Sequence, residues 1–172
     1  MKELLNDFKS ESLDLCRKMI TILEHCEDNP ADNSGLEQYG QLADRIMGGA
    51  KIFIMNVGDE SGRMSVIATF TEIQKLLGYK GANLPANSGL LPVVIGFLLD
   101  STELIEEVVR SLDGSDISAA SRLVAKTILD RLTWVNAQFD ASISGAVPLT
   151  HKRLDQRQIT ELIELLKRTQ IG

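Results

Sequence analysis

The chain has 172 residues, of which 44% are hydrophobic and 24% are charged, and its formal net charge is -6 at pH 7. These values are typical of a compact domain and exclude a chain that is disordered throughout. Because only 5% of the residues are aromatic and the chain has four prolines, the composition disfavours a β-sandwich or barrel and predicts an all-α fold.

Charge is divided unevenly along the chain. Residues 1–149 hold 13 basic and 21 acidic side chains, whereas residues 150–172 hold five basic and three acidic ones. An acidic body repels the phosphate backbone, so no nucleic-acid partner is expected. The longest apolar run, residues 90–99, is about half as long as a membrane-spanning helix, and the amino terminus lacks the apolar block of a secretory signal. We therefore expect no membrane span and a cytoplasmic location.

The first expected element is a long helix. Apolar residues recur every three or four positions from Leu4 to Cys26, which predicts one buried stripe on a helix that begins near Leu4. Turn-forming residues follow at 28–35. Ser34, with Glu37 three residues later, predicts a capping box at the start of a second helix.

Three more helices are expected to complete a bundle. The second should run from about Gly35 to about Asn56 and end at the glycine-containing segment 58–62. The third should run over about 63–79, carry an apolar stripe that includes Leu76, and end in a glycine pattern formed by Gly78 and Gly81. The fourth should run over about 88–112. Short links between these helices predict an up-and-down four-helix bundle at residues 1–112.

The rest of the chain is expected to add helices to this bundle. Residues 113–140 carry a fifth helical stripe, which predicts a long helix that packs on the bundle or on a second copy of the chain in a homodimer. Residues 141–151 are small and poorly periodic, as in a linker. Residues 152–172 are predicted to form an amphipathic helix. Its apolar seam, at spacings i, i+3, i+4 and i+7, comprises Ile159, Leu162, Ile163 and Leu166.

Conventional catalytic groups are scarce in this sequence. His25 and His151 are the only histidines, and each is expected to be a surface residue. Cys16 and Cys26 form neither a disulfide framework nor a zinc-ligand pattern and are expected to be reduced core or boundary residues. The chain has no phosphate-loop spacing and no activated nucleophile context. No cofactor and no metal are therefore expected.

The pair Gly48-Gly49 is the most informative local feature. Two glycines inside a predicted helix cost about 1 kcal/mol each relative to alanine. Close packing of a neighbouring helix would explain them, and so would a surface that lets the backbone of a partner approach. Asp44 lies one turn earlier on a polar face that points away from the apolar stripe. The other members of that face are Glu37, Gln41 and Lys51.

At this point the chain resembles a known family. The segment Leu42-Ala-Asp-Arg-Ile-Met-Gly-Gly-Ala-Lys-Ile-Phe53 is similar to the signature helix of histidine phosphotransfer (Hpt) domains, especially those at the amino end of chemotaxis histidine kinases. The family pattern is Ala-His-x-Leu-Lys-Gly-Ser/Gly-Ala, in which the exposed histidine accepts the phosphoryl group. The resemblance covers about residues 1–112. It implies a bacterial two-component signalling bundle that docks a response regulator receiver domain or a histidine kinase.

Two positions depart from the family pattern. Asp44 stands where the family has its phosphoacceptor histidine, and Met47 stands where it has the lysine that interacts with the phosphoryl group. An exposed carboxylate does not replace an imidazole nucleophile without a metal and a charge-stabilising shell. We therefore expect a non-catalytic docking module with a fixed negative charge at Asp44. Its expected contact residues are Glu37, Gln41, Asp44, Met47, Gly48 and Lys51 from the second helix, and Ile159, Leu162, Ile163 and Leu166 from the last one.

Two alternatives stay open. The carboxyl-terminal segment resembles short peptides by which flagellar-switch proteins and the chemotaxis phosphatase engage their regulators, although a helix that folds back on the bundle would show the same pattern. Glu37 and Gln41, four residues apart, resemble the acid and amide pair with which helical phosphatases position water beside a phosphoaspartate. The first alternative is therefore a response-regulator phosphatase. The second is a structural helical bundle outside phosphorelay signalling.

Overall fold

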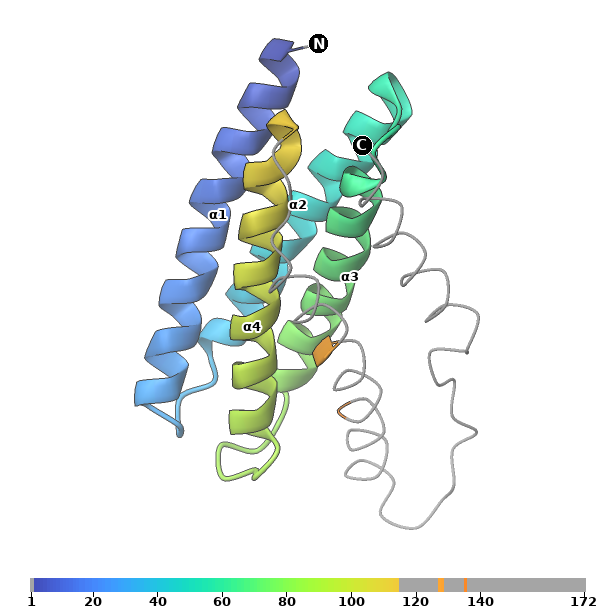
Figure 1. Ribbon diagram of the computed structural model, residues 1–172. Coiled ribbons are helices and arrows are strands. Elements are labelled where there is room, and N and C mark those ends of the chain that lie inside the picture. Colours follow the sequence, from blue (N-terminus) through green and yellow to red (C-terminus); the bar gives the residue numbers. More distant parts are fainter. Residues whose placement is uncertain (1, 115–126, 129–134, 136–172) are drawn as a thin grey trace, which may run out of the picture.

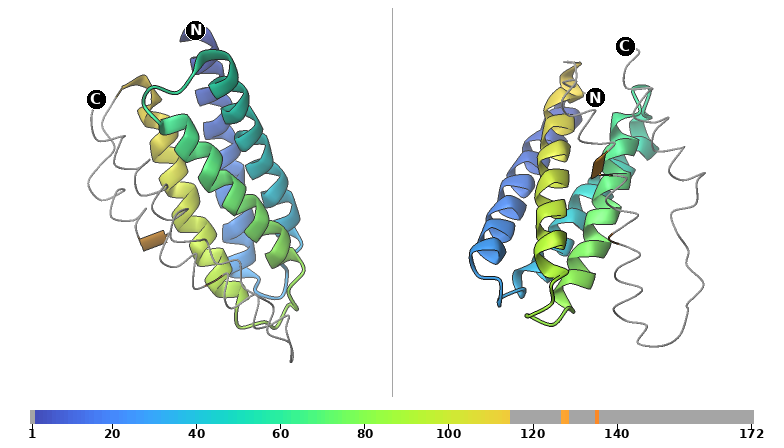
Figure 2. Two further views of the ribbon diagram at one scale, coloured as in Figure 1. Left: turned by 90° about the vertical axis from the view of Figure 1, so that its right-hand side faces the viewer. Right: turned by 60° about the horizontal axis from the view of Figure 1, so that its bottom comes forward.

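Four helices form a closed bundle in a computed structural model of the protein, which describes residues 2–114, 127, 128 and 135. The helices are α1 (Lys2–Asp28), α2 (Gly35–Val57), α3 (Arg63–Ala82) and α4 (Leu91–Arg110), followed by a short 3-10 helix, η1 (Ser111–Asp113). Consecutive helices run antiparallel, and α4 packs back against α1 (Figure 1, Figure 2). The predicted all-α, up-and-down bundle is confirmed for these residues, among which there is no strand.

Little of the chain beyond the bundle is described. Ile128 and Val135, two positions of the predicted fifth stripe, are buried and belong to the hydrophobic core. The other residues of 115–140, the linker at 141–151 and the amphipathic segment 152–172 lie outside the described residues. Within the described part, none of the helices has the length and apolar character needed to cross a membrane.

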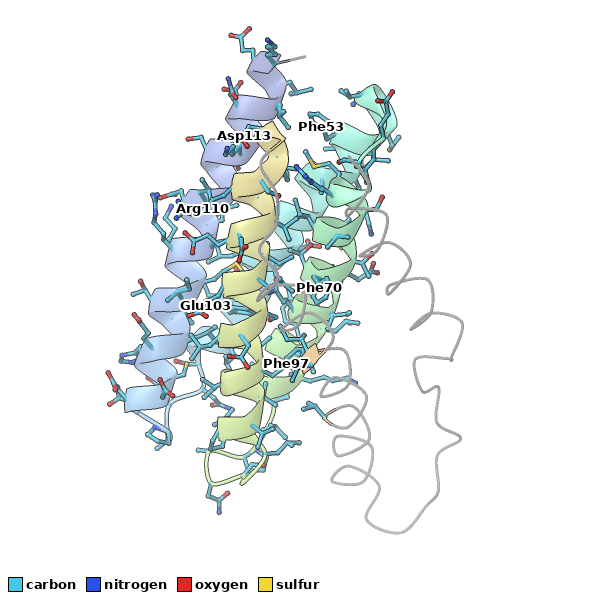
Figure 3. All side chains as sticks on the ribbon, viewed as in Figure 1. Phe53, Phe70, Phe97, Glu103, Arg110 and Asp113 are labelled. Carbon is cyan, nitrogen blue, oxygen red and sulfur yellow. The ribbon has the colours of Figure 1, made fainter. Side chains whose placement is uncertain are left out.

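The predicted stripes supply most of the core. Phe53, Phe70 and Phe97, from three different helices, are buried inside the bundle (Figure 3). Two predicted stripe positions are wrong, because Leu4 and Leu76 are exposed. Adjacent residues of a helix point about 100° apart, so Leu77 takes the inward position on α3 and leaves Leu76 on the outer face.

Glycines bring α2 and α3 into backbone contact. A Cβ atom on Gly78 would lie 2.9 Å from the carbonyl oxygen of Leu36 and 3.0 Å from the amide nitrogen of Gly40. The prediction that Gly78 and Gly81 end the third helix is therefore wrong, since both are buried within α3 and the helix continues to Ala82. Gly78 and Gly81 serve helix packing, and α3 ends at Ala82 with Asn83 as its C-cap.

The loop residue Asn33 holds one end of the bundle. Asn33, between α1 and α2, donates from Nδ2 to the carbonyl oxygens of Gly81, Ala82 and Leu84 at 2.8–3.3 Å, which satisfies the end of α3. The predicted capping box is wrong, because the Ser34 side chain accepts no amide hydrogen bond from α2. Its hydroxyl donates to Asp32 Oδ1 at 2.6 Å instead.

The opposite end of the bundle is held by three separate contacts. The Asp59 carboxylate caps α3 by accepting the amide N–H of Ser65 at 2.7 Å. The guanidinium of buried Arg63 donates to the carbonyl oxygen of Ser111 at the end of α4. Lys9 of α1 pairs with Asp113 at 2.8 Å, where the end of α4 lies beside the first half of α1 (Figure 3). These contacts fix the ends of three helices relative to one another.

A buried polar layer aligns α2, α3 and α4. Thr102 Oγ1 donates to the carbonyl oxygen of Leu98, so the 2.8 Å bond between Thr102 and Tyr39 is donated by the Tyr39 phenol. Gln74 of α3 donates to Ser101 Oγ at 3.0 Å. Burial raises the pKa of Tyr39 above its usual range, so the phenol stays protonated as this layer requires.

The three hydrogen bonds of Asn33 give a testable prediction. Asn33→Ala should lower the free energy of unfolding by about 1–3 kcal/mol, because carbonyl groups at the end of α3 lose their donor. Asn33→Asp should cost more, since a carboxylate would face the same carbonyl oxygens. Urea unfolding followed by circular dichroism measures both, with Asn87→Ala in the exposed loop after α3 as the control. Equal stability of the Asn33 and Asn87 variants would contradict the assignment.

Candidate functional site

The predicted contact residues of the second helix lie together on the outer side of α2. Glu37, Gln41, Asp44, Gly48 and Lys51 recur at intervals of three or four residues, so they share one side of the helix. Glu37, Gln41 and Lys51 are exposed, and Asp44, Met47 and Gly48 are partly exposed. The buried stripe of α2 runs through Tyr39, Ala43, Ile46, Ala50 and Phe53 on the other side.

The two central glycines have different surroundings. A Cβ atom on Gly49 would lie 3.0 Å from Cε2 of Phe8, so Gly49 makes room for an aromatic ring of α1. A Cβ atom on Gly48 would meet no described atom within 4 Å. Helix packing therefore accounts for Gly49, whereas Gly48 leaves a bare turn of backbone on the surface of α2.

Asp44 is paired with a cation that α3 supplies. Lys75 Nζ lies 2.7 Å from Asp44 Oδ1, and the side chains of Lys75 and Asp44 are 31% and 46% exposed. The hydrogen bond that Lys75 donates to Asp44 raises the pKa of Lys75 above its ordinary value, and the negative charge of Asp44 acts in the same direction. Asp44 is therefore half of an ion pair whose two side chains are both partly exposed.

Further ion pairs flank the same side of α2. Toward α3, Lys51 Nζ lies 3.5 Å from Glu72 Oε2. Toward α1, Arg45 Nη2 lies 2.5 Å from Glu11 Oε1. Exposed pairs of this kind contribute little to stability. Their effect here is to leave the charges on either side of Gly48 largely compensated.

Two large, exposed apolar side chains follow Gly48 on the outer side of α2. Ile52 and Met55 are 60% and 85% exposed and follow Gly48 at i+4 and i+7, so they lie on the same side of α2. We use the name α2 face for this surface. It comprises Glu37, Gln41, Asp44, Met47, Gly48, Lys51, Ile52 and Met55.

Sequence reasoning missed three participants in this surface. Ile52 and Met55 could have been found, because their spacing from Gly48 puts them on the same side of a helix. No sequence pattern around Lys75 indicates its pairing with Asp44, because the two residues lie on different helices. The nearest indication is Gly78, whose lack of a side chain lets α3 approach α2.

The other candidate groups lie elsewhere or are unreactive. His25 is exposed at the end of α1, with Nε2 3.4 Å from Asp32 Oδ2, and His151 lies outside the described residues. Cys16 and Cys26 are buried as predicted. Burial raises the pKa of Cys16 to about 12 and raises that of Cys26 as well, so both thiols stay protonated and unreactive. The described residues contain no group of three side chains suited to hold a metal ion.

No protein-family model matches the chain, and neither does any curated protein or any solved structure. The chemistry of the α2 face is that of its own side chains, which are carboxylates, an amide, an ammonium group, thioethers and one branched alkyl group. None of these is an activated nucleophile. Charged and polar side chains occupy the first part of the face, and exposed apolar side chains occupy its carboxyl end.

The contrast between two glycines gives the second prediction. Gly48→Ala should raise the free energy of unfolding by about 0.5–1 kcal/mol, because the new methyl group meets open space and alanine favours the helix. Gly78→Ala should lower it by about 1–3 kcal/mol, because its Cβ would press on the backbone of α2. Thermal and urea unfolding of the two variants tests this. Destabilisation by Gly48→Ala would show that the turn at Gly48 is covered.

Proposed function

We propose that this chain is a pseudo-phosphotransfer module of two-component, chemotaxis-type signalling. Through the α2 face it binds the receiver domain of a response regulator, or a histidine kinase, and it carries no phosphate itself. A bacterial, cytoplasmic setting is part of this proposal, since these partners act there. The observation that carries it is the bare turn at Gly48 in the middle of an exposed helix side.

The composition of the α2 face supports docking. A helix without a side chain at one turn lets a partner approach its backbone closely, and the cost of glycine in a helix has no packing explanation at this position. Ile52 and Met55 offer apolar area beside that turn, and methionine adapts its shape to different partners. Exposed apolar side chains next to paired charges are compatible with the mixed composition of transient interfaces.

The side chains at the α2 face argue against phosphate transfer by this chain. α2 contains no histidine, and Asp44 occupies the position of the family's phosphoacceptor. The Asp44 carboxylate is engaged by Lys75 at 2.7 Å, which lowers its ability to attack an electrophile. In this proposal the module acts by occupancy: it competes with an active phosphotransfer domain for the same partner, and its effect depends on affinity.

A bulky substitution at Gly48 tests the proposal. Gly48→Gln keeps the helix and the charge but fills the bare turn, so binding of the intact chain to a receiver or kinase should weaken at least about tenfold, which corresponds to about 1.4 kcal/mol. Receiver and kinase domains from the same cell are screened by biolayer interferometry. Ser10→Gln, an exposed change on α1, is the matched control and should bind like the wild type. Failure of every domain to bind the wild type would favour a structural bundle outside phosphorelay signalling.

A phosphatase is the second candidate, and one observation favours it. Glu37 and Gln41 are both exposed and lie one turn apart on α2, so an acid and an amide could enter a partner's site together. An amide orients water, while the receiver and its Mg²⁺ stabilise the transferred charge.

Dephosphorylation of a labelled receiver separates the two candidates. Under the docking proposal, the intact chain leaves the rate of phosphate loss unchanged or lowers it by covering the site. A rate increase that disappears in Gln41→Ala but persists in Gln38→Ala, the neighbouring exposed amide, would instead assign the phosphatase activity. Phosphate release from the ³²P-labelled receiver measures the rate in each case.

A further inference from the structure

Three exposed apolar side chains gather at the carboxyl end of the α2 face. Ile52 and Met55 of α2 are 60% and 85% exposed, and Leu4 of α1 is 45% exposed. Glu11 of α1 pairs with Arg45 of the antiparallel α2. One step of seven residues along each helix leads from this pair to Leu4 and Ile52, so these two side chains lie level with each other. We call Leu4, Ile52 and Met55 the apolar patch. Exposed apolar side chains that gather in this way indicate a contact surface.

Met55 and the bare turn at Gly48 have matching shapes. A Cβ atom on Gly48 would meet no described atom within 4 Å, whereas Met55 extends into solvent seven residues later. Seven residues make two turns, so the turn and the protruding side chain share one side of α2 and lie ~10 Å apart. A second α2 laid antiparallel on the first would bring each Met55 level with Gly48 of the other copy. The twofold axis of this pair would pass beside Ile52.

The same arrangement provides partners for the groups on both sides of the axis. A twofold contact joins the same surface of the two copies. Toward α1, Leu4 and Ile52 of both copies would meet in one apolar cluster. Toward α3, each Lys51 would lie near its own Glu72, which is 3.5 Å away, and near Glu72 of the second copy. Cations and anions therefore alternate at this contact. A face without an excess of either charge suits a second copy better than a strongly acidic or basic partner.

We propose that the apolar patch binds a second copy of this chain. The contact is antiparallel and twofold-symmetric, and Met55 of each copy covers the turn at Gly48 of the other. One helix side from each copy makes a small interface, so the dimer is weak and forms at micromolar concentrations. The dimer does not rest on the proposed docking function. It competes with docking, because both use the turn at Gly48, and self-association then sets how much of the α2 face is free.

Sedimentation equilibrium of the intact chain tests self-association. The average mass should rise from that of one chain toward that of two between about 1 μM and about 500 μM. Met55→Gln and Gly48→Gln should each weaken the dimer at least about tenfold, because the first removes the protruding side chain and the second fills the turn. Val93→Gln is the control, since it changes an exposed apolar residue of α4, diagonally across the bundle from α2. A wild-type chain that stays monomeric throughout this range would overturn the proposal.

Cross-linking tests the geometry of the dimer. Cys16 and Cys26 are buried, so new surface cysteines can be oxidised selectively. Ile52→Cys should form a disulfide-linked dimer, since this position lies beside the twofold axis. Gly48→Cys should link to Met55→Cys when the two variants are mixed. Each of these two alone should link poorly, because equivalent positions of the two copies lie ~10 Å apart. Efficient linking of Met55→Cys to itself, without linking in the mixture, would overturn this arrangement.

Thiol labelling distinguishes a second copy from another segment of the same chain. At about 1 μM, where the chain should be monomeric, Met55→Cys should react with a thiol reagent as fast as Val93→Cys. Slow labelling of Met55→Cys at this concentration would mean that the chain covers its own apolar patch, which would overturn the dimer.

The outcomes also separate the dimer from the docking proposal. Receiver binding without self-association leaves docking in place and overturns the dimer alone, and self-association without receiver binding does the reverse. If both occur, an added receiver should lower the dimer fraction. A receiver that binds the dimer without dissociating it would overturn the shared use of Gly48. Thermal unfolding of each variant confirms that the fold is intact, as expected for changes at exposed positions.

Discussion

Backbone contact between α2 and α3 is the constraint on which the rest of the bundle depends. Gly78 has no room for even one carbon atom, since that atom would lie within about 3 Å of the backbone at Leu36 and Gly40. Helices that touch in this way bring their flanking side chains within reach across the seam, including Asp44 and Lys75. A larger residue at position 78 would widen the seam and separate the two charges.

The bundle presents α2 as a rigid support for its outer side. Asn33 joins the loop before α2 to the end of α3, and Arg63 joins the start of α3 to the end of α4. The buried bond between Tyr39 and Thr102 fixes α2 against α4. A contact surface built on such a helix keeps its shape between free and bound states, which reduces the entropy lost on binding.

The sequence predicted the order of the four helices that the structure describes in residues 2–114, because apolar periodicity is a local property. It misplaced the end of α3 because glycine serves both as a helix stop and as a point of close packing, and only the neighbouring helix decides between them at Gly78. It misread Ser34 because this residue has helical backbone angles and its hydroxyl points to Asp32, to which it donates, so the Ser34 oxygen accepts no amide hydrogen bond from α2. The spacing rule for a capping box does not say which of the nearby hydrogen bonds the hydroxyl makes.

The same limit applies to the candidate site. The residues of the α2 face share one helix, so their grouping followed from spacing alone, and the different surroundings of Gly48 and Gly49 did not. Gly49 is explained by Phe8, more than forty residues earlier in the chain. The charge state of the face depends in the same way on Lys75, 31 residues after Asp44.

The position of Lys75 has a consequence for any substitution at position 44. An imidazole ring placed at position 44 would meet an ammonium group from α3 at once, without any change at Met47. The electrostatic surroundings of position 44 are therefore set by the neighbouring helix and would persist through a change of the side chain at that position.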